Sequence, residues 1–99
     1  GSASLFANPN PIIVNSSDSL LLGIATLSLN APKAGVTELH VNAPDGPMFA
    51  RGGSSGTAVT YKWVTNGMTF YLQDVTNGQP LTAANTLATT TVLVSYPPQ

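Results

Sequence analysis

Short stretches in which apolar and polar residues alternate run through most of the chain, and this two-residue period predicts β-strands with one buried face. Between residues 20 and 31, for example, Ala25, Leu27 and Leu29 face one way and the polar residues between them face the other. Such patterns predict seven strands, over residues 4–14, 20–31, 36–43, 48–51, 57–64, from Met68 onward, and 87–96. No stretch combines the length and the 3.6-residue period of an amphipathic helix. The chain is therefore expected to be all-β.

Turn signals separate the predicted strands. Residues 44–47 read Pro-Asp-Gly-Pro, in which proline presets φ and glycine accepts a positive φ, and Asn66-Gly67 is a two-residue turn. Residues 52–56 are expected to form a flexible glycine-rich loop, and they lack the Lys-Ser/Thr pair that would follow a phosphate-binding loop. Residues 81–85 are expected to be a loop with one short turn at most. Turns every eight to twelve residues or so are typical of a two-sheet β-sandwich with Greek-key connections.

Two stretches define the expected centre and edge of this sandwich. Residues 61–74 contain the only tryptophan, Trp63, together with two of the three tyrosines and one of the three phenylalanines. They hold most of the bulk that is available to nucleate a core. Residues 4–14 are interrupted by Pro9 and Pro11, which cannot donate hydrogen bonds to a neighbouring strand. That stretch predicts a kinked edge strand, which pairs first with one sheet and then with the other.

Length and composition exclude several classes of function. The 99 residues make a single domain, expected at residues 4–96, with residues 1–3 a cloning remnant and disordered start and residues 97–99 a tail. The absence of cysteine excludes disulfides and thiolate chemistry. Three basic residues and a net charge of −1 do not suit the phosphate backbone of nucleic acid. No apolar run approaches the roughly 20 residues that cross a bilayer, so membrane insertion is not expected.

The low charge of the chain changes the picture of its surface. Charged residues make up 7% of the sequence, against about a quarter in an average protein. Ser, Thr, Asn, Gln and Gly must therefore cover the surface, a composition that favours a secreted or cell-surface β module over a cytosolic enzyme. The threonine-rich last strand, residues 87–96, also lacks the charges that usually protect a sheet edge. We expect a monomer or a weakly self-associating protein.

Two short motifs carry a family resemblance. Residues 26–32, Thr-Leu-Ser-Leu-Asn-Ala-Pro, resemble the second strand of fibronectin type III and related immunoglobulin-like domains, and residues 64–70 resemble their turn into the sixth strand. The resemblance implies a seven-stranded Ig-like Greek-key sandwich. Leu29 stands where these families usually have tryptophan, and Phe70 stands at the corner where they usually have tyrosine, so the corner hydrogen bond is not expected. Trp63 is hypothesised to supply the core bulk missing at Leu29.

The whole chain also resembles Ig-like accessory modules that are attached to larger bacterial proteins, including carbohydrate-active ones. Such modules act as spacers, as sugar-binding units or as parts of a surface scaffold. The resemblance therefore implies an extracellular, cell-surface or periplasmic location, with the neighbouring domains of a larger parent protein as partners. It implies no cofactor.

The residues that could carry catalysis are few. His40 is the only histidine, so it lacks the companions that a metal site or a catalytic triad needs, and a solvated position on an outward strand face is expected for it. The acidic residues are Asp18, Glu38, Asp45 and Asp74. A glycosidase needs two carboxyl groups facing each other across a cleft, and a sandwich of this size has little cleft to offer. No catalytic residue and no metal site are expected.

The alternation does assemble one candidate binding face. If the strands form as predicted, seven polar residues lie side by side on the outer surface of one sheet: Glu38, His40, Asn42, Tyr71, Gln73, Thr89 and Thr91. An exposed tyrosine among amides and hydroxyls suits a sugar, but it is also what an ordinary exposed sheet presents. A second candidate platform combines Trp63, Tyr61 and Arg51, and it requires that Trp63 is exposed; a lone tryptophan in a small sandwich is more often part of the core.

These observations lead to two functional hypotheses. The first is a non-catalytic module that acts as a spacer or protein-interaction domain of a larger bacterial surface or secreted protein. The alternative is a carbohydrate-binding module, in which the ligand-binding residues are Trp63, Tyr71, Gln73, His40, Asn42 and Arg51. The exposure of the aromatic rings discriminates between the two, because a sugar-binding module must present at least one flat ring to solvent.

Overall fold

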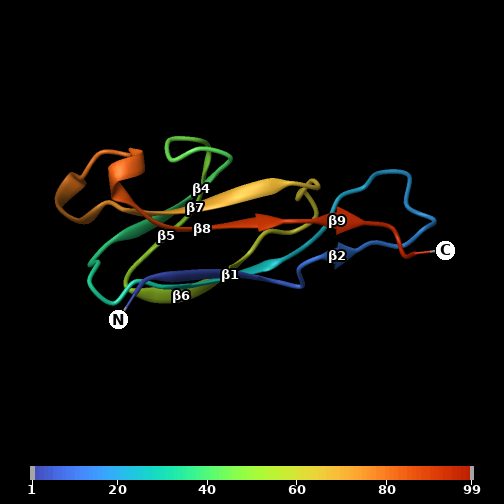
Figure 1. Ribbon diagram of the computed structural model, residues 1–99, viewed down its shortest axis with the longest axis horizontal. Coiled ribbons are helices and arrows are strands. Elements are labelled where there is room, and N and C mark those ends of the chain that lie inside the picture. The colour runs from blue at the N-terminus through green and yellow to red at the C-terminus, as the bar shows by residue number, and fades with distance from the viewer. Residues whose placement is uncertain (1, 99) are drawn as a thin grey trace.

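The computed structural model describes residues 2–98, and it is built from two main β-sheets packed face to face and a third sheet of two short strands, β2 and β9 (Figure 1). One sheet has three strands in the order β1-β3-β6, and the other has four in the order β5-β4-β7-β8. The strands are β1 (Ser4–Asn8), β2 (Ile12–Ile13), β3 (Thr26–Asn30), β4 (Thr37–Val41), β5 (Met48–Gly52), β6 (Ser55–Val59), β7 (Met68–Asp74), β8 (Thr86–Val92) and β9 (Val94–Ser95). Two short 3-10 turns, Thr76–Gly78 and Ala83–Asn85, lie between β7 and β8. The predicted all-β class is confirmed.

The core is the apolar layer between the two sheets. Leu27 on β3 faces Leu39 on β4 and Phe70 and Leu72 on β7, and all four side chains are fully buried. Val92 at the end of β8 is equally buried. These are positions that the alternation of apolar and polar residues assigns to the inward face. The side chains enter from alternate positions of each strand because successive residues of a strand point to opposite faces of its sheet.

The first predicted strand is divided at its prolines, and its second part pairs with β9 in a separate two-stranded sheet rather than with the four-stranded sheet. β1 pairs antiparallel with β3, and β2 then pairs in parallel with β9, which continues the line of β8. Between them, the Asn10 side-chain amide donates to the carbonyl oxygen of Thr91 at 3.0 Å and accepts from the N–H of Leu93 at 3.1 Å. Residues 2–98 therefore form nine strands rather than seven, since both the first and the last predicted strands are divided in two.

Two expectations about the middle of the chain are wrong. The glycine-rich stretch 52–56 is not a flexible loop, because β5 ends at Gly52 and β6 begins at Ser55. The next predicted strand, 57–64, ends at Val59, and Trp63 lies in a turn beyond it rather than on the strand. Thr60 is fully buried, and its hydroxyl accepts the N–H of Ala25 at 2.9 Å, which ties the chain down as it leaves β6.

The turns elsewhere follow the sequence signals. Met68 donates its N–H to the carbonyl of Thr65 across the Asn66-Gly67 turn, where Gly67 has a φ of 86°. Gly46 donates to the carbonyl of Ala43 in the turn before β5. A side chain at Gly46 would place a Cβ 2.0 Å from the carbonyl oxygen of Val41, so this turn requires glycine.

The molecule is elongated, with extents of 48 × 23 × 18 Å. The strands run along the longest axis, and β1 begins at one end while β9 finishes near the other (Figure 1). The described ends of the chain therefore lie at opposite poles of the sandwich.

Removing a core side chain tests the position of the apolar layer. Leu27→Ala is expected to lower the free energy of unfolding by about 2–5 kcal/mol, because it deletes buried methyl groups and leaves a cavity between the sheets. Leu93→Ala makes the same chemical change at a side chain that is 51% exposed, and it should change the free energy of unfolding by less than about 0.5 kcal/mol. Equilibrium urea unfolding of both variants beside the original chain measures the difference. Equal losses would contradict this core.

Candidate functional site

The outer face of the four-stranded sheet brings the predicted polar residues together. Glu38 lies opposite Gln73, and His40 lies opposite Tyr71, which in turn lies opposite Thr89 on β8. Thr69 and Thr91 form the next pair, with their hydroxyl oxygens 2.8 Å apart. The register therefore places these side chains next to one another, as the alternation predicts.

His40 is not the solvated histidine that the sequence suggests, because it is only 3% exposed. Its Nδ1 lies 2.6 Å from the carbonyl oxygen of Gly46, and its Nε2 lies 2.7 Å from Oε1 of Glu38. A carbonyl oxygen can only accept, so Nδ1 carries a hydrogen. The Arg51 guanidinium donates to the other carboxylate oxygen of Glu38. Residues 42–47 thus fold back over the face and are held there through Nδ1 of His40, while Nε2 binds Glu38 on the same strand.

Gln73 is covered in a similar way at the opposite end of the face. The residue is fully buried, its Nε2 donates to the carbonyl of Thr82 at 2.9 Å, and its Oε1 accepts the hydroxyl of Thr86. A bulge between Leu72 and Gln73 marks the place where the pairing with β8 shifts. The amide that sequence analysis assigns to ligand recognition is therefore used to attach the segment before β8 to the sheet.

Three of the candidate residues stay accessible between these two coverings. Tyr71 is half-buried, and Thr89 and Thr91 are exposed. Asn42 is exposed as well, but its Oδ1 accepts the N–H of Thr69 at 3.0 Å and its own N–H donates to the carbonyl of Thr69. The open part of the face is thus a short strip of hydroxyl groups beside one tyrosine.

Trp63 lies outside this face, at the border of the core. Its ring packs edge-on against Phe49, with centroids 5.2 Å apart, and lies tilted 6.0 Å from Phe70. Phe49 and Phe70 do not cover the whole ring, and Trp63 remains 36% exposed. It borders a shallow hollow of about 350 Å³, lined by Val41, Pro47, Met48, Phe49, Trp63 and Met68.

The predicted platform of Trp63, Tyr61 and Arg51 is not what surrounds this hollow. Neither Tyr61 nor Arg51 lines it, and Arg51 is engaged with Glu38 on the outer face. Phe49 and Met48 are neighbours of Trp63 that were not predicted from the sequence. The available signal is the Met-Phe pair directly after Pro47, since adjacent strand residues face opposite sides and one of the two must point toward the core.

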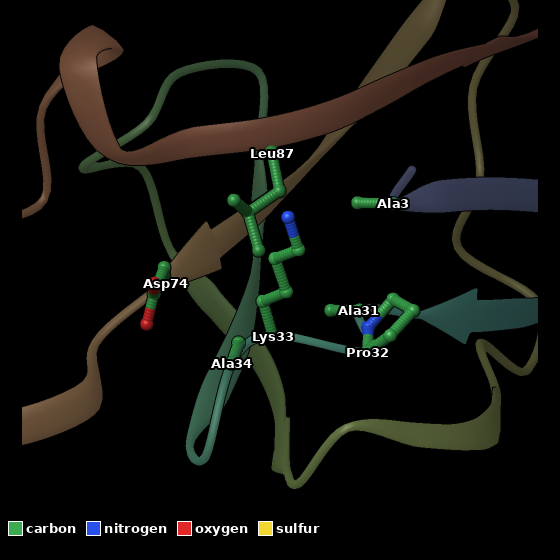
Figure 2. Close-up of a pocket in the computed structure, with 7 residues that line it drawn as sticks. All are labelled: Ala3, Ala31, Pro32, Lys33, Ala34, Asp74 and Leu87. Atoms are coloured by element: carbon green, nitrogen blue, oxygen red, sulfur yellow. The ribbon is translucent and has the colours of Figure 1, made fainter. Parts of the chain in front are cut away.

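A smaller pocket of about 120 Å³ lies near the end of β7, and it is lined by Ala3, Ala31, Pro32, Lys33, Ala34, Asp74 and Leu87 (Figure 2). Lys33 extends into it, while the Asp74 carboxylate points away from the lysine amine. Hydrogen bonds from the side chain and backbone N–H of Thr76 lower the pKa of Asp74, which identifies this carboxylate as part of a turn. The volume is well below the roughly 300 Å³ at which ligand pockets begin.

The remaining acidic residues do not gather. Asp18 pairs with Lys62 at 3.4 Å, Glu38 is held between His40 and Arg51, and Asp45 is exposed in the turn before β5. Among residues 2–98 no group of three or more His, Cys, Asp or Glu side chains could hold a metal ion.

Removing the His40 ring is expected to release residues 42–47. His40→Ala removes the donor to the half-buried Gly46 carbonyl and one of the two partners of the Glu38 carboxylate, which keeps Arg51, and this should cost about 1–3 kcal/mol of stability. Compared with the original chain, amide hydrogen exchange in His40→Ala should become faster at residues 42–47 and stay the same in β7. Thr89→Ala, at an exposed position of the same face, is the matched control and should leave both quantities unchanged. An unchanged exchange pattern in His40→Ala would contradict the role of His40 as the clamp of this loop.

Comparison with known proteins identifies no relative of this chain. No family model, curated protein or solved structure matches the chain. Over the described residues, no helix is long and apolar enough to span a bilayer.

Proposed function

We propose that the chain is an Ig-like, fibronectin type III-like module, which serves as a non-catalytic spacer or interaction domain of a larger bacterial surface or secreted protein. The strand order supports the fold assignment. β3 and β4 are consecutive in the chain but lie in different sheets, and the same is true of β5 and β6. Connections that cross between two antiparallel sheets in this manner are typical of Greek-key sandwiches.

The position of the two ends is the observation that carries the spacer function. The described chain enters at one pole of a body 48 Å long and leaves near the other pole (Figure 1). A module with this geometry adds its full length to a polypeptide that continues on both sides. A fold with adjacent ends would add almost nothing to that length.

The use of polar side chains supports a non-catalytic role. His40, the only residue suited to act as a general base near neutral pH, has both ring nitrogens engaged and is buried. The amide of Gln73 is likewise occupied by main-chain and hydroxyl partners. These groups hold loops onto the sheet, and because they are buried they are not accessible to a substrate.

A tandem fusion tests the spacer function. Two copies joined directly through residues 98 and 2 should have a maximum dimension about 48 Å greater than that of one copy, when measured by small-angle X-ray scattering of a dilute sample. A fusion with a long Gly/Ser linker is the control, because its flexible linker gives a broad distribution of dimensions. If the direct fusion is no longer than a single copy, the modules fold back on each other and the spacer function is wrong.

The hollow beside Trp63 supports carbohydrate binding as a second candidate function. Its volume of about 350 Å³ lies at the lower end of the range for ligand sites, and the partly exposed indole ring could stack on the C–H face of a sugar. The lining is almost wholly apolar, however, so a sugar would find few hydrogen-bond partners there. This weighs in favour of the spacer or interaction module.

Tryptophan fluorescence distinguishes the two functions. Because Trp63 is 36% exposed, acrylamide should quench its emission only in part. A sugar-binding module should change that emission with at least one soluble polysaccharide of a panel, and Trp63→Phe should abolish its retardation in an affinity gel containing the same polysaccharide. Emission that responds to no polysaccharide rejects the carbohydrate candidate and leaves the spacer function in place.

A further inference from the structure

Four strands lie at the edges of the two sheets, namely β1, β5, β6 and β8. An edge strand presents main-chain N–H and C=O groups that have no partner within its own sheet, and these groups can pair with a strand of another molecule. Natural proteins close or guard such edges. The four edges of this protein differ in how far they do so.

The threonine-rich sequence predicts self-association through the β8 edge. Some of the main-chain groups at this edge already have partners within the molecule. The carbonyl of Val92 accepts the N–H of Gly67, which precedes β7, whereas the carbonyl of Thr91 accepts from Asn10, so the main-chain groups of Thr89 and Thr91 point outward. Asn10 takes up the carbonyl of Thr91 and the N–H of Leu93, and the N–H of Ile12 donates to the carbonyl of Leu93 at 2.7 Å. The kinked first strand thus occupies much of this edge.

Two further edges are also protected. On β1 the outward main-chain groups belong to Leu5 and Ala7, and Leu5 is only 5% exposed. On β5 the pairing shifts between Leu39 and His40 of the neighbouring strand, and the outward position is taken by the charged Arg51. Burial, an irregular edge and a charge are the usual means by which an edge strand is kept from pairing.

The β6 edge has none of these protections. At its two ends, Thr60 donates to the carbonyl of Ala25 and Ala31 donates to the carbonyl of Ser54, which shows that even-numbered residues of this segment face β3. The main-chain groups of Ser55, Thr57 and Val59 therefore point away from β3. All three residues are exposed, and β6 contains neither a charge nor a proline.

The space beside β6 is open as well. A Cβ built at Gly56 would meet no atom within 4 Å. A hollow of about 60 Å³ separates β6 from β5, with Leu29, Ala50 and Ala58 among the residues that line it. Arg51 of β5 also lines this hollow, but among the described strands only β3 pairs with β6.

We propose that this edge pairs with β6 of a second copy of the chain, antiparallel and around a two-fold axis at Thr57. In that register Thr57 lies opposite its own counterpart, and Ser55 lies opposite Val59 in both directions. Each of the three residues per copy has its N–H and C=O aimed at the partner strand, so every pair exchanges two hydrogen bonds. The two three-stranded sheets become one sheet of six strands, closed by the two-fold symmetry.

The composition of β6 fits this partner. Its five residues, Ser-Gly-Thr-Ala-Val, place no charge opposite a like charge in the self-paired strand. Threonine opposite threonine is a favourable cross-strand pair. The contact is small beside the roughly 800 Å² per partner of a standard interface, so the dimer forms only at high protein concentration. This pairing goes beyond the spacer function and does not depend on it.

Sedimentation velocity over a concentration series tests the pairing. The original chain should shift from monomer to dimer as its concentration rises toward the millimolar range. Thr57→Lys places two ammonium groups opposite each other at the two-fold axis, and it should remain monomeric throughout. Thr89→Lys, the same change at an exposed threonine of the β8 edge, is the matched control and should dimerise like the original chain. Circular dichroism melting of all three should show the same fold and the same Tm within a few degrees.

A charge-swap experiment then fixes the register. Thr57→Lys and Thr57→Glu should each be monomeric alone and should form a one-to-one heterodimer when mixed, because the two side chains meet directly across the axis. A monomeric original chain at every concentration would overturn the proposal. So would a dimer that survives Thr57→Lys but is lost in Thr89→Lys, since that result would place the contact at β8.

Discussion

The contact between the inner faces of the two sheets is the interaction on which the rest of this structure depends. Leu27 from one sheet meets Leu39, Phe70 and Leu72 from the other, and all are fully buried. With no cysteine and few charges, the chain has neither disulfides nor extended ion-pair networks to add to this layer. The strands, the covered outer face and the free edge all keep their places because these apolar side chains hold the sheets together.

Polar side chains have a consistent second task, which is to satisfy the main chain where regular pairing ends. Asn10 bridges two main-chain groups of the last strands, Asn66 accepts the N–H of Val94 at 2.9 Å, and the Thr76 hydroxyl accepts the N–H groups of Gly35 and Val36. Side-chain hydrogen bonds of this kind are the usual alternative to a missing strand partner. Some of the Asn and Thr side chains, which the composition assigns to the surface of the protein, thus satisfy main-chain groups of the fold. A polar composition indicates which groups are available, and only their contacts show whether a ligand can reach them.

Much of the fold could be predicted from sequence because its signals are local. A two-residue period places Leu39 inward and Glu38 outward whatever the rest of the chain does, and a proline interrupts pairing wherever it falls. The burial of His40 and Gln73 could not be predicted in this way. It depends on segments 42–47 and 80–86 folding back over the sheet, and the covering residues act through main-chain carbonyls that carry no sequence signature. The partial covering of the threonine-rich β8 edge also depends on contacts between distant residues, since Asn10 binds main-chain groups of Thr91 and Leu93.

The free edge and the positions of the chain ends are geometrically independent, and this independence matters for a module within a longer polypeptide. The strands run along the long axis, so β6 lies along the side of the body while the described ends lie at its poles (Figure 1). A polypeptide that continues from both poles would extend along the long axis of the module. Pairing through the β6 edge joins two modules side by side without using either pole. A string of such modules could therefore extend in one direction and pair with a neighbouring string in another, with different residues responsible for each.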